Sequence, residues 1–236
     1  MSVYVLVHGW WGGGWEWRAV AHALRAQGHE VYAPTLSGLG DRAHVPVDPA
    51  ALTLGLHIED VIQLTYFEDL RDVILVGWSY GADIVAGVAD RVPERVRHVV
   101  NFDGGLVRDG QAAADESTTD PLLVDARANG WVAPPGNDDL AGSLADPELR
   151  AWVADRLRPQ PVATEFTPFP DFGRRRDAIP HTYIRCTVRD IDDEPEPPNI
   201  TALRSAANWR FRELPFNHLA LTYAPQDVAA LLHELG

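Results

Sequence analysis

The chain has 236 residues, of which 46% are hydrophobic, and its 34 acidic against 20 basic side chains give a formal net charge of −14. This length provides for a sizeable hydrophobic core in one or two domains, and the acidic balance disfavours nucleic acids and anionic membranes as partners. Every basic side chain is an arginine, which excludes lysine Schiff-base chemistry, and the single cysteine, Cys186, excludes an internal disulfide.

The N-terminus enters a predicted strand at Val3 without the charged and apolar regions of a signal peptide. No run of about 18 apolar residues occurs that could span a membrane. With a lone cysteine, this pattern predicts a cytoplasmic protein.

Strands alternate with helices along the first 104 residues. The apolar runs at 3–7 and 73–77 are typical of strands that are buried on both faces of a parallel sheet. The alternation predicts an open, mostly parallel six-stranded sheet with helices on both faces and right-handed crossovers. Further strands are expected at residues 29–34, 97–103, 181–188 and 209–214, with helices near 15–26, 57–70, 199–207 and 225–235.

Residues 105–178 interrupt the alternation. They are rich in Pro, Asp and Ala, with short helical signals near 121–128 and 147–157. An insertion of this length between two strands of a compact sheet is usually functional. We therefore predict a core of residues 1–104 and 179–236 and a helical cap of residues 105–178 above the strand ends, the alternative being a peripheral decoration. The arginine run at 174–176 is expected to lie on a solvated face.

A nucleophile elbow is predicted at residues 77–81. An apolar run leads into Gly77-Trp78-Ser79-Tyr80-Gly81, which has the pattern G-x-S-x-G, and an apolar helical stretch follows. A serine on such a turn has strained backbone, so glycines two residues away on each side avoid a clash. The helix directs N–H groups toward the oxygen on which charge develops. Ser79 is the predicted nucleophile, the alternative being a bystander serine in a glycine-rich turn.

Five motifs occur in a fixed order along essentially the whole chain. Together they resemble the α/β-hydrolases, and more narrowly the cofactor-free group of plant methyl salicylate esterases, hydroxynitrile lyases and bacterial carboxylesterases that includes pyrethroid hydrolases. The resemblance implies a sheet without the first strands of the larger fold, a helical cap, and a triad in the order Ser, Asp, His. The motifs are His8-Gly9-Trp10-Trp11-Gly12-Gly13-Gly14-Trp15-Glu16-Trp17, Gly28-His29-Glu30-Val31, Gly77-Trp78-Ser79-Tyr80-Gly81, Tyr183-Ile184-Arg185-Cys186-Thr187 and Asn217-His218-Leu219.

The resemblance places the catalytic base at His218, which lies in a loop after the last predicted strand. The triad acid should closely follow the fifth strand, but an arginine occupies the expected position and Asp190 comes one place later. Asp190 is the favoured acid. The alternative is Asp103, at the end of the fourth strand, with Asp192 and Asp193 as further candidates. The acid orients the base and stabilises its imidazolium without taking the proton.

By the same resemblance, the backbone N–H groups of Trp10 and Tyr80 form the oxyanion hole. Trp11 and Trp131 are expected to bind substrate, because buried aromatic pockets suit apolar ligands. One departure is Trp78, which is large for the second position of the elbow. A second is Asp83, which lies in the first turn of the next helix and suits its dipole. Its charge would also raise the pKa of the catalytic histidine if the two were close.

No group of His, Cys, Asp and Glu has metal-site spacing, and the glycines at 12–14 match no nucleotide-binding loop. We therefore expect no metal and no other cofactor. The expected partner is a small-molecule apolar ester or lactone, rather than nucleic acid or membrane, and self-association into a homodimer is left open.

Three functions compete. The favoured one is a serine carboxylesterase or lactonase that cleaves a bulky apolar or aromatic substrate through an acyl-enzyme. The second is a lyase or elimination enzyme of a biosynthetic pathway; cyanohydrin cleavage itself is disfavoured, because Gly9 and Leu219 stand where the resembled lyases have threonine and lysine. The third is a non-catalytic receptor for a small ligand, which the Ser79 and His218 pair makes less favourable.

Overall fold

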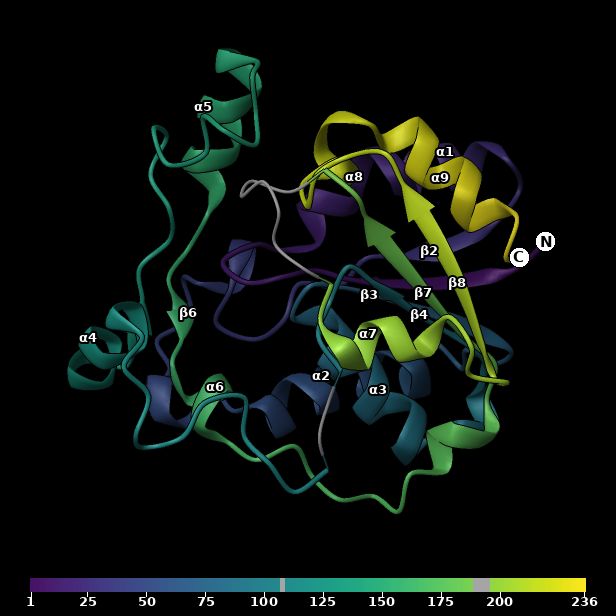
Figure 1. Ribbon diagram of the computed structural model, residues 1–236, viewed down its shortest axis with the longest axis horizontal. Coiled ribbons are helices and arrows are strands. Elements are labelled where there is room, and N and C mark those ends of the chain that lie inside the picture. Colours follow the sequence, from purple (N-terminus) through teal and green to yellow (C-terminus); the bar gives the residue numbers. More distant parts are fainter. Residues whose placement is uncertain (107–108, 189–195) are drawn as a thin grey trace.

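Six parallel strands form the centre of the structure, a computed structural model that describes residues 1–106, 109–188 and 196–236. Their order across the sheet is β2-β1-β3-β4-β7-β8 (Figure 1). Strands β4 and β7 are therefore neighbours, although the long insertion separates them in the sequence. This confirms the predicted fold class. The strands are β1 Val3–Val7, β2 Glu30–Tyr32, β3 Val73–Trp78, β4 Val96–Phe102, β7 His181–Cys186 and β8 Trp209–Leu214.

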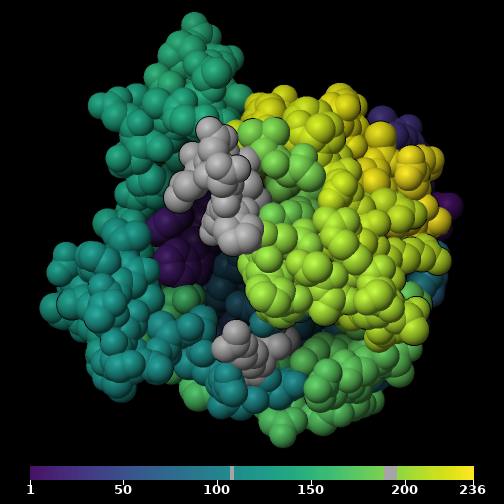
Figure 2. All heavy atoms as spheres, in the orientation of Figure 1, coloured from purple at the N-terminus to yellow at the C-terminus, as the bar shows by residue number. Residues whose placement is uncertain are grey.

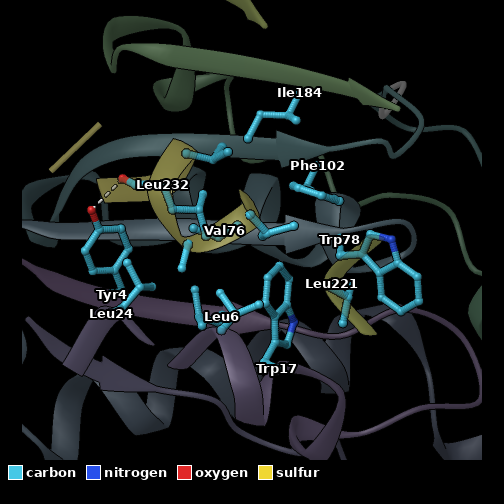
Figure 3. Packing of buried hydrophobic residues seen from close by; sticks show 14 of the residues in the cluster. Tyr4, Leu6, Trp17, Leu24, Val76, Trp78, Phe102, Ile184, Leu221 and Leu232 are labelled. Carbon is cyan, nitrogen blue, oxygen red and sulfur yellow. Dashed lines mark hydrogen bonds between the residues drawn. The ribbon is translucent and has the colours of Figure 1, made fainter. Parts of the chain in front are cut away.

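Helices cover both faces of the sheet, each over its own apolar core (Figure 1). One core lies under α1 and α9 and contains Leu6, Trp17 and Phe102, all fully buried (Figure 3). The Tyr4 hydroxyl closes it at one end by donating to the Leu232 carbonyl over 2.8 Å. The other core lies under α2 and α3. The helices are α1 Arg18–Ala26, α2 Leu54–Phe67, α3 Gly81–Arg91, α7 Pro198–Leu203, α8 Ala220–Tyr223 and α9 Pro225–His233.

Helix α2 begins three residues earlier than the sequence predicts. Thr53 is its N-cap, because the Thr53 hydroxyl accepts a hydrogen bond from the Leu56 N–H at 3.3 Å. Such a cap satisfies one of the unpaired amides of the first turn. Before α1, residues 14–17 form a 3₁₀ turn rather than part of the helix.

The inserted segment, residues 105–178, lies to one side of the core beyond the strand ends (Figure 1). It is fixed to the tryptophan-rich loop after β1: the Arg158 N–H donates to the Trp11 carbonyl over 2.8 Å, and the Trp11 indole donates to the Val132 carbonyl over 3.1 Å. Its described helices and strands are α4 Pro121–Asn129, β5 Trp131–Val132, α5 Pro147–Arg156, β6 Gln160–Pro161 and α6 Ala163–Phe166, and a 3₁₀ turn follows at Arg175–Ala178.

The expectation that the arginine run is solvated is wrong for Arg176, which is only 6% exposed. Its guanidinium pairs with the buried carboxylate of Asp90 on α3 and with Asp109. A buried carboxylate needs such a partner, and the pair fixes the end of the inserted segment to the core. Within the described ranges, no helix is long and apolar enough to cross a membrane. The cytoplasmic location stays a prediction.

Candidate active site

The elbow has the geometry that its sequence predicts. Ser79 has a φ of +55°, in the left-handed region, between the end of β3 and the start of α3. Its N–H donates to the Phe102 carbonyl of the neighbouring strand over 3.0 Å. A Cβ at Gly77 would overlap the Gly81 carbonyl, and one at Gly81 would lie 2.5 Å from the Val7 carbonyl oxygen. The strain at Ser79 is therefore held by close backbone packing on both sides.

His218 is hydrogen-bonded to a carboxylate at the end of β4. Its Nδ1 donates to Asp103 Oδ2 over 2.7 Å, and the Asp103 side chain is only 1% exposed. The second oxygen of Asp103 accepts the Cys186 N–H at 3.0 Å. Asp103 itself has a φ of +50°, and its N–H donates to the Ile184 carbonyl of β7. The neighbouring strand β7 thus fixes the backbone and one oxygen of Asp103, which leaves the other oxygen for His218.

The carboxylate on His218 is thus Asp103, the alternative acid of the sequence analysis. Asp190, the favoured acid, lies outside the described residues, as do Asp192 and Asp193. No hydrogen bond joins the Ser79 hydroxyl to the His218 ring in the part of the chain that the structure describes. Contacts of this kind are often long before substrate binds.

Trp78, large for its position in the elbow, positions the loop that carries His218. Its indole N–H donates to the His218 carbonyl over 2.9 Å, and the two ring centroids lie 5.1 Å apart. From the other side, the Asn217 amide donates to the Ser143 carbonyl over 2.7 Å. The histidine loop is therefore held by the elbow on one side and by the inserted segment on the other.

We expect Trp78→Phe to lower kcat for a good ester by about three- to tenfold, because it removes one hydrogen bond to the histidine loop and keeps an aromatic ring. KM should change less, since Trp78 does not line the pocket at Ser79. Steady-state kinetics with thermal unfolding as a control measure this. An increase in KM with an unchanged kcat would contradict the positioning role of Trp78.

Two backbone amides next to Ser79 have no acceptor within the described ranges: those of Trp10 and Tyr80. The Tyr80 side chain is fixed, because its hydroxyl is 2.9 Å from His57 Nδ1.

Under the Trp10 loop, His8 accepts the Leu36 N–H at 3.0 Å, and burial lowers the pKa of His8 to about 4. The His8 ring is therefore neutral near pH 7 and acts as a support for the loop.

A pocket of about 390 Å³ opens beside Ser79. The space-filling view shows a hollow between the teal inserted segment and the yellow-green core, with purple atoms of the N-terminal part at its floor (Figure 2). The pocket has aromatic and acidic lining residues. They are Trp10, Trp11, Ser79, Tyr80, Asp83, Asp103, Gly104, Gly105 and Glu165.

The structure brings Trp11 to this pocket but not Trp131. Trp131 lines a separate cavity of about 410 Å³ with Gly38 and Arg158. The reason is strand parity: in β5 the adjacent residue, Val132, is fully buried, so Trp131 points to the opposite side. The sequence could not fix this parity for a strand of two residues.

Two further carboxyl groups line the pocket. From the sequence, Asp83 is considered only for its charge, at the helix dipole and near the histidine, and Glu165 has no expected role. Asp83 belongs to the first turn of α3, and Glu165 belongs to α6 of the inserted segment. Burial raises the pKa of Asp83 to about 7. Burial, together with the nearby charge of Asp83, raises the pKa of Glu165 to about 7. In the described residues, no group of three or more His, Cys, Asp and Glu could hold a metal ion.

Comparisons with known proteins agree with the fold. The alpha/beta hydrolase family matches residues 4–231. A carbendazim hydrolyzing esterase of Nocardioides sp. (strain SG-4G) is 34% identical over 249 residues, covering 100% of both chains. An extracellular alpha/beta-hydrolase from a Paenibacillus species, described as sharing structural and functional homology with tobacco salicylic acid binding protein 2, has a TM-score of 0.82 at 25% identity and covers 100% of this chain and 99% of its own. The methylesterase MES16 of Arabidopsis has a TM-score of 0.74 at 19% identity, covering 100% and 98% of the two chains, and supports the fold alone.

Proposed function

Since the chain belongs to the alpha/beta hydrolase family, we propose that it is a serine esterase that cleaves a carboxylic ester through an acyl-enzyme at Ser79. One observation carries the proposal: the strained Ser79 elbow shares a pocket with Asp103, the carboxylate that holds the His218 ring. In this proposal Ser79 is the nucleophile, Asp103 at the end of β4 is the acid and His218 is the base. Their order along the chain is the family's order Ser, Asp, His.

In the proposed reaction, His218 takes the proton of the Ser79 hydroxyl as the oxygen attacks the ester carbonyl carbon. The amides of Trp10 and Tyr80 donate to the oxyanion that forms; one such donor is typically worth about 3–4 kcal/mol of transition-state stabilisation. His218 then protonates the leaving alkoxide, which leaves the acyl group on Ser79. Water, deprotonated by His218, releases the acid and restores the serine. Asp103 stabilises the imidazolium throughout and stays ionised.

The substrate places an aromatic or other flat apolar part against Trp10 and Trp11. Their ring centroids lie 5.2 Å apart at an interplanar angle of 79°, which gives two walls for such a group. The inserted segment acts as a lid in this proposal, supported by Glu165 in the pocket and by the contact of Ser143 with Asn217. The relative that hydrolyses carbendazim makes that compound the first substrate to test.

A substrate panel tests the reaction class. The panel contains carbendazim, aryl and alkyl esters, a lactone and mandelonitrile, each assayed before and after labelling with a fluorophosphonate. We expect ester hydrolysis that the label abolishes, and no cyanide release, since Gly9 and Leu219 do not match the cyanohydrin lyases. Release of cyanide at a rate above that of ester hydrolysis would favour the lyase instead, and tight ligand binding without any turnover would favour a receptor.

A further inference from the structure

The pocket at Ser79 is more acidic than its proposed chemistry requires. An acyl-enzyme mechanism uses one carboxylate, Asp103, which is already engaged by His218 and Cys186. Asp83 and Glu165 line the same pocket from opposite parts of the chain, one from the core and one from the inserted segment. Because this pocket also holds the candidate nucleophile and two unengaged amides, it is a ligand site independently of these two carboxyl groups.

Neither carboxyl group has a cationic partner in the described ranges. All cationic side chains of the protein are arginines, and no arginine acts on the pKa of Asp83 or Glu165. Asp120 adds further negative charge near Glu165, and only the Trp10 indole, a neutral donor, counteracts it. Two carboxyl groups that share one pocket without a cation cost folding free energy.

The two groups therefore match a ligand that brings the missing charge or N–H donors. We propose that Asp83 and Glu165 bind a basic nitrogen group of the substrate, so that the ester carries an amine- or amidine-like set of N–H donors in addition to its scissile bond. This inference rests on the proposed esterase function and specifies its substrate class. It also replaces the purely apolar ligand that the tryptophans alone suggest.

The position of Asp83 indicates where the nitrogen group lies. A second cavity of about 400 Å³ shares Asp83 and Gly105 with the Ser79 pocket and continues past Leu54 and Phe169. Asp83 thus stands at the junction of the two spaces. A substrate with its ester carbonyl at Ser79 would therefore direct its nitrogen group toward this junction.

A matched pair of esters tests the inference. Methyl para-amidinobenzoate carries the N–H donors, and methyl para-isopropenylbenzoate has the same shape without them. The measured quantity is the ratio of kcat/KM for the amidine ester to kcat/KM for its isostere. We expect this ratio to fall about ten- to a hundredfold in Asp83→Asn and in Glu165→Gln, because each variant loses a charge-assisted hydrogen bond. Glu148→Gln, an exposed acid on α5, removes the same charge away from the pocket and should leave the ratio unchanged.

Benzamidine binding, measured by calorimetry, decides the matter without turnover. We expect binding to the wild type that weakens about tenfold or more in either pocket variant and not in Glu148→Gln. The inference would be overturned if the ratio of kcat/KM for the two esters were unchanged in both pocket variants. It would also be overturned if benzamidine bound the wild type and the three variants equally, or bound none of them. Failure of the proposed esterase function would give a different result, namely that Ser79→Ala retains turnover. Benzamidine binding to the wild type and to the two pocket variants would still report on Asp83 and Glu165 in that case.

Discussion

Ser79→Ala is expected to lower kcat for an activated ester by a factor of about 10⁶, the scale seen when a serine hydrolase loses its nucleophile. The backbone amides of Trp10 and Tyr80 remain in the variant, so a small rate above that in water should survive. The alanine keeps the left-handed elbow, which backbone hydrogen bonds of Ser79 to Phe102 and Ala82 hold. Initial rates with a para-nitrophenyl ester, together with a thermal unfolding curve, measure the effect.

Ser205→Ala is the matched control, because Ser205 is exposed beyond the end of α7. It should retain full activity and the same unfolding temperature. If Ser79→Ala kept more than a few per cent of wild-type kcat while remaining folded, Ser79 would not be the nucleophile.

Asp103→Asn is expected to lower kcat by a factor of about 10⁴. Asp103 Oδ2 accepts the Nδ1 proton of His218 and so leaves Nε2 free to act as the base. An asparagine amide can donate to Nδ1 instead, which favours the tautomer that cannot accept the serine proton. The variant should still fold, because its remaining oxygen can accept the Cys186 N–H.

Steady-state kinetics of Asp103→Asn beside Asp190→Asn separates the two candidate acids. The geometry predicts that Asp190→Asn stays within a few fold of the wild type. The opposite pattern is a large loss of kcat in Asp190→Asn, with Asp103→Asn nearly as active as the wild type. That result would assign the role of triad acid to Asp190, in the loop after β7.

The elbow that carries the proposed nucleophile could be predicted from sequence because its signal is local. The glycines that Ser79 requires lie two residues away on either side, and the strand and helix that frame it adjoin them. The proposed base, by contrast, is identified through the resemblance rather than from a local pattern. His218 is one histidine among nine, and only its place after the last strand of a known fold distinguishes it.

The partner of His218 depends on sheet order, which no local pattern contains. Asp103 reaches His218 because β4 and β7 are adjacent, so that the end of β4 lies against Cys186. In the sequence, 82 residues separate Asp103 and Cys186, with the inserted segment between them. A left-handed φ at an aspartate is equally invisible in the sequence.

The character of the pocket was the other feature that the sequence could not supply. Tryptophans in the loop after β1 favoured an apolar site, and Trp11 does line the pocket, yet it also anchors the inserted segment. Glu165 lies far along the chain from Asp83, on a helix of only four residues. Their approach is a product of how the inserted segment folds back over the core.

Rapid-quench mass spectrometry of the wild type with a para-nitrophenyl ester tests the central claim most directly. We predict a transient mass increase equal to one acyl group, located on the peptide that contains Ser79, which forms and decays fast enough to account for turnover. Hydrolysis at the full rate with no adduct, or with the acyl group on another residue, would contradict it.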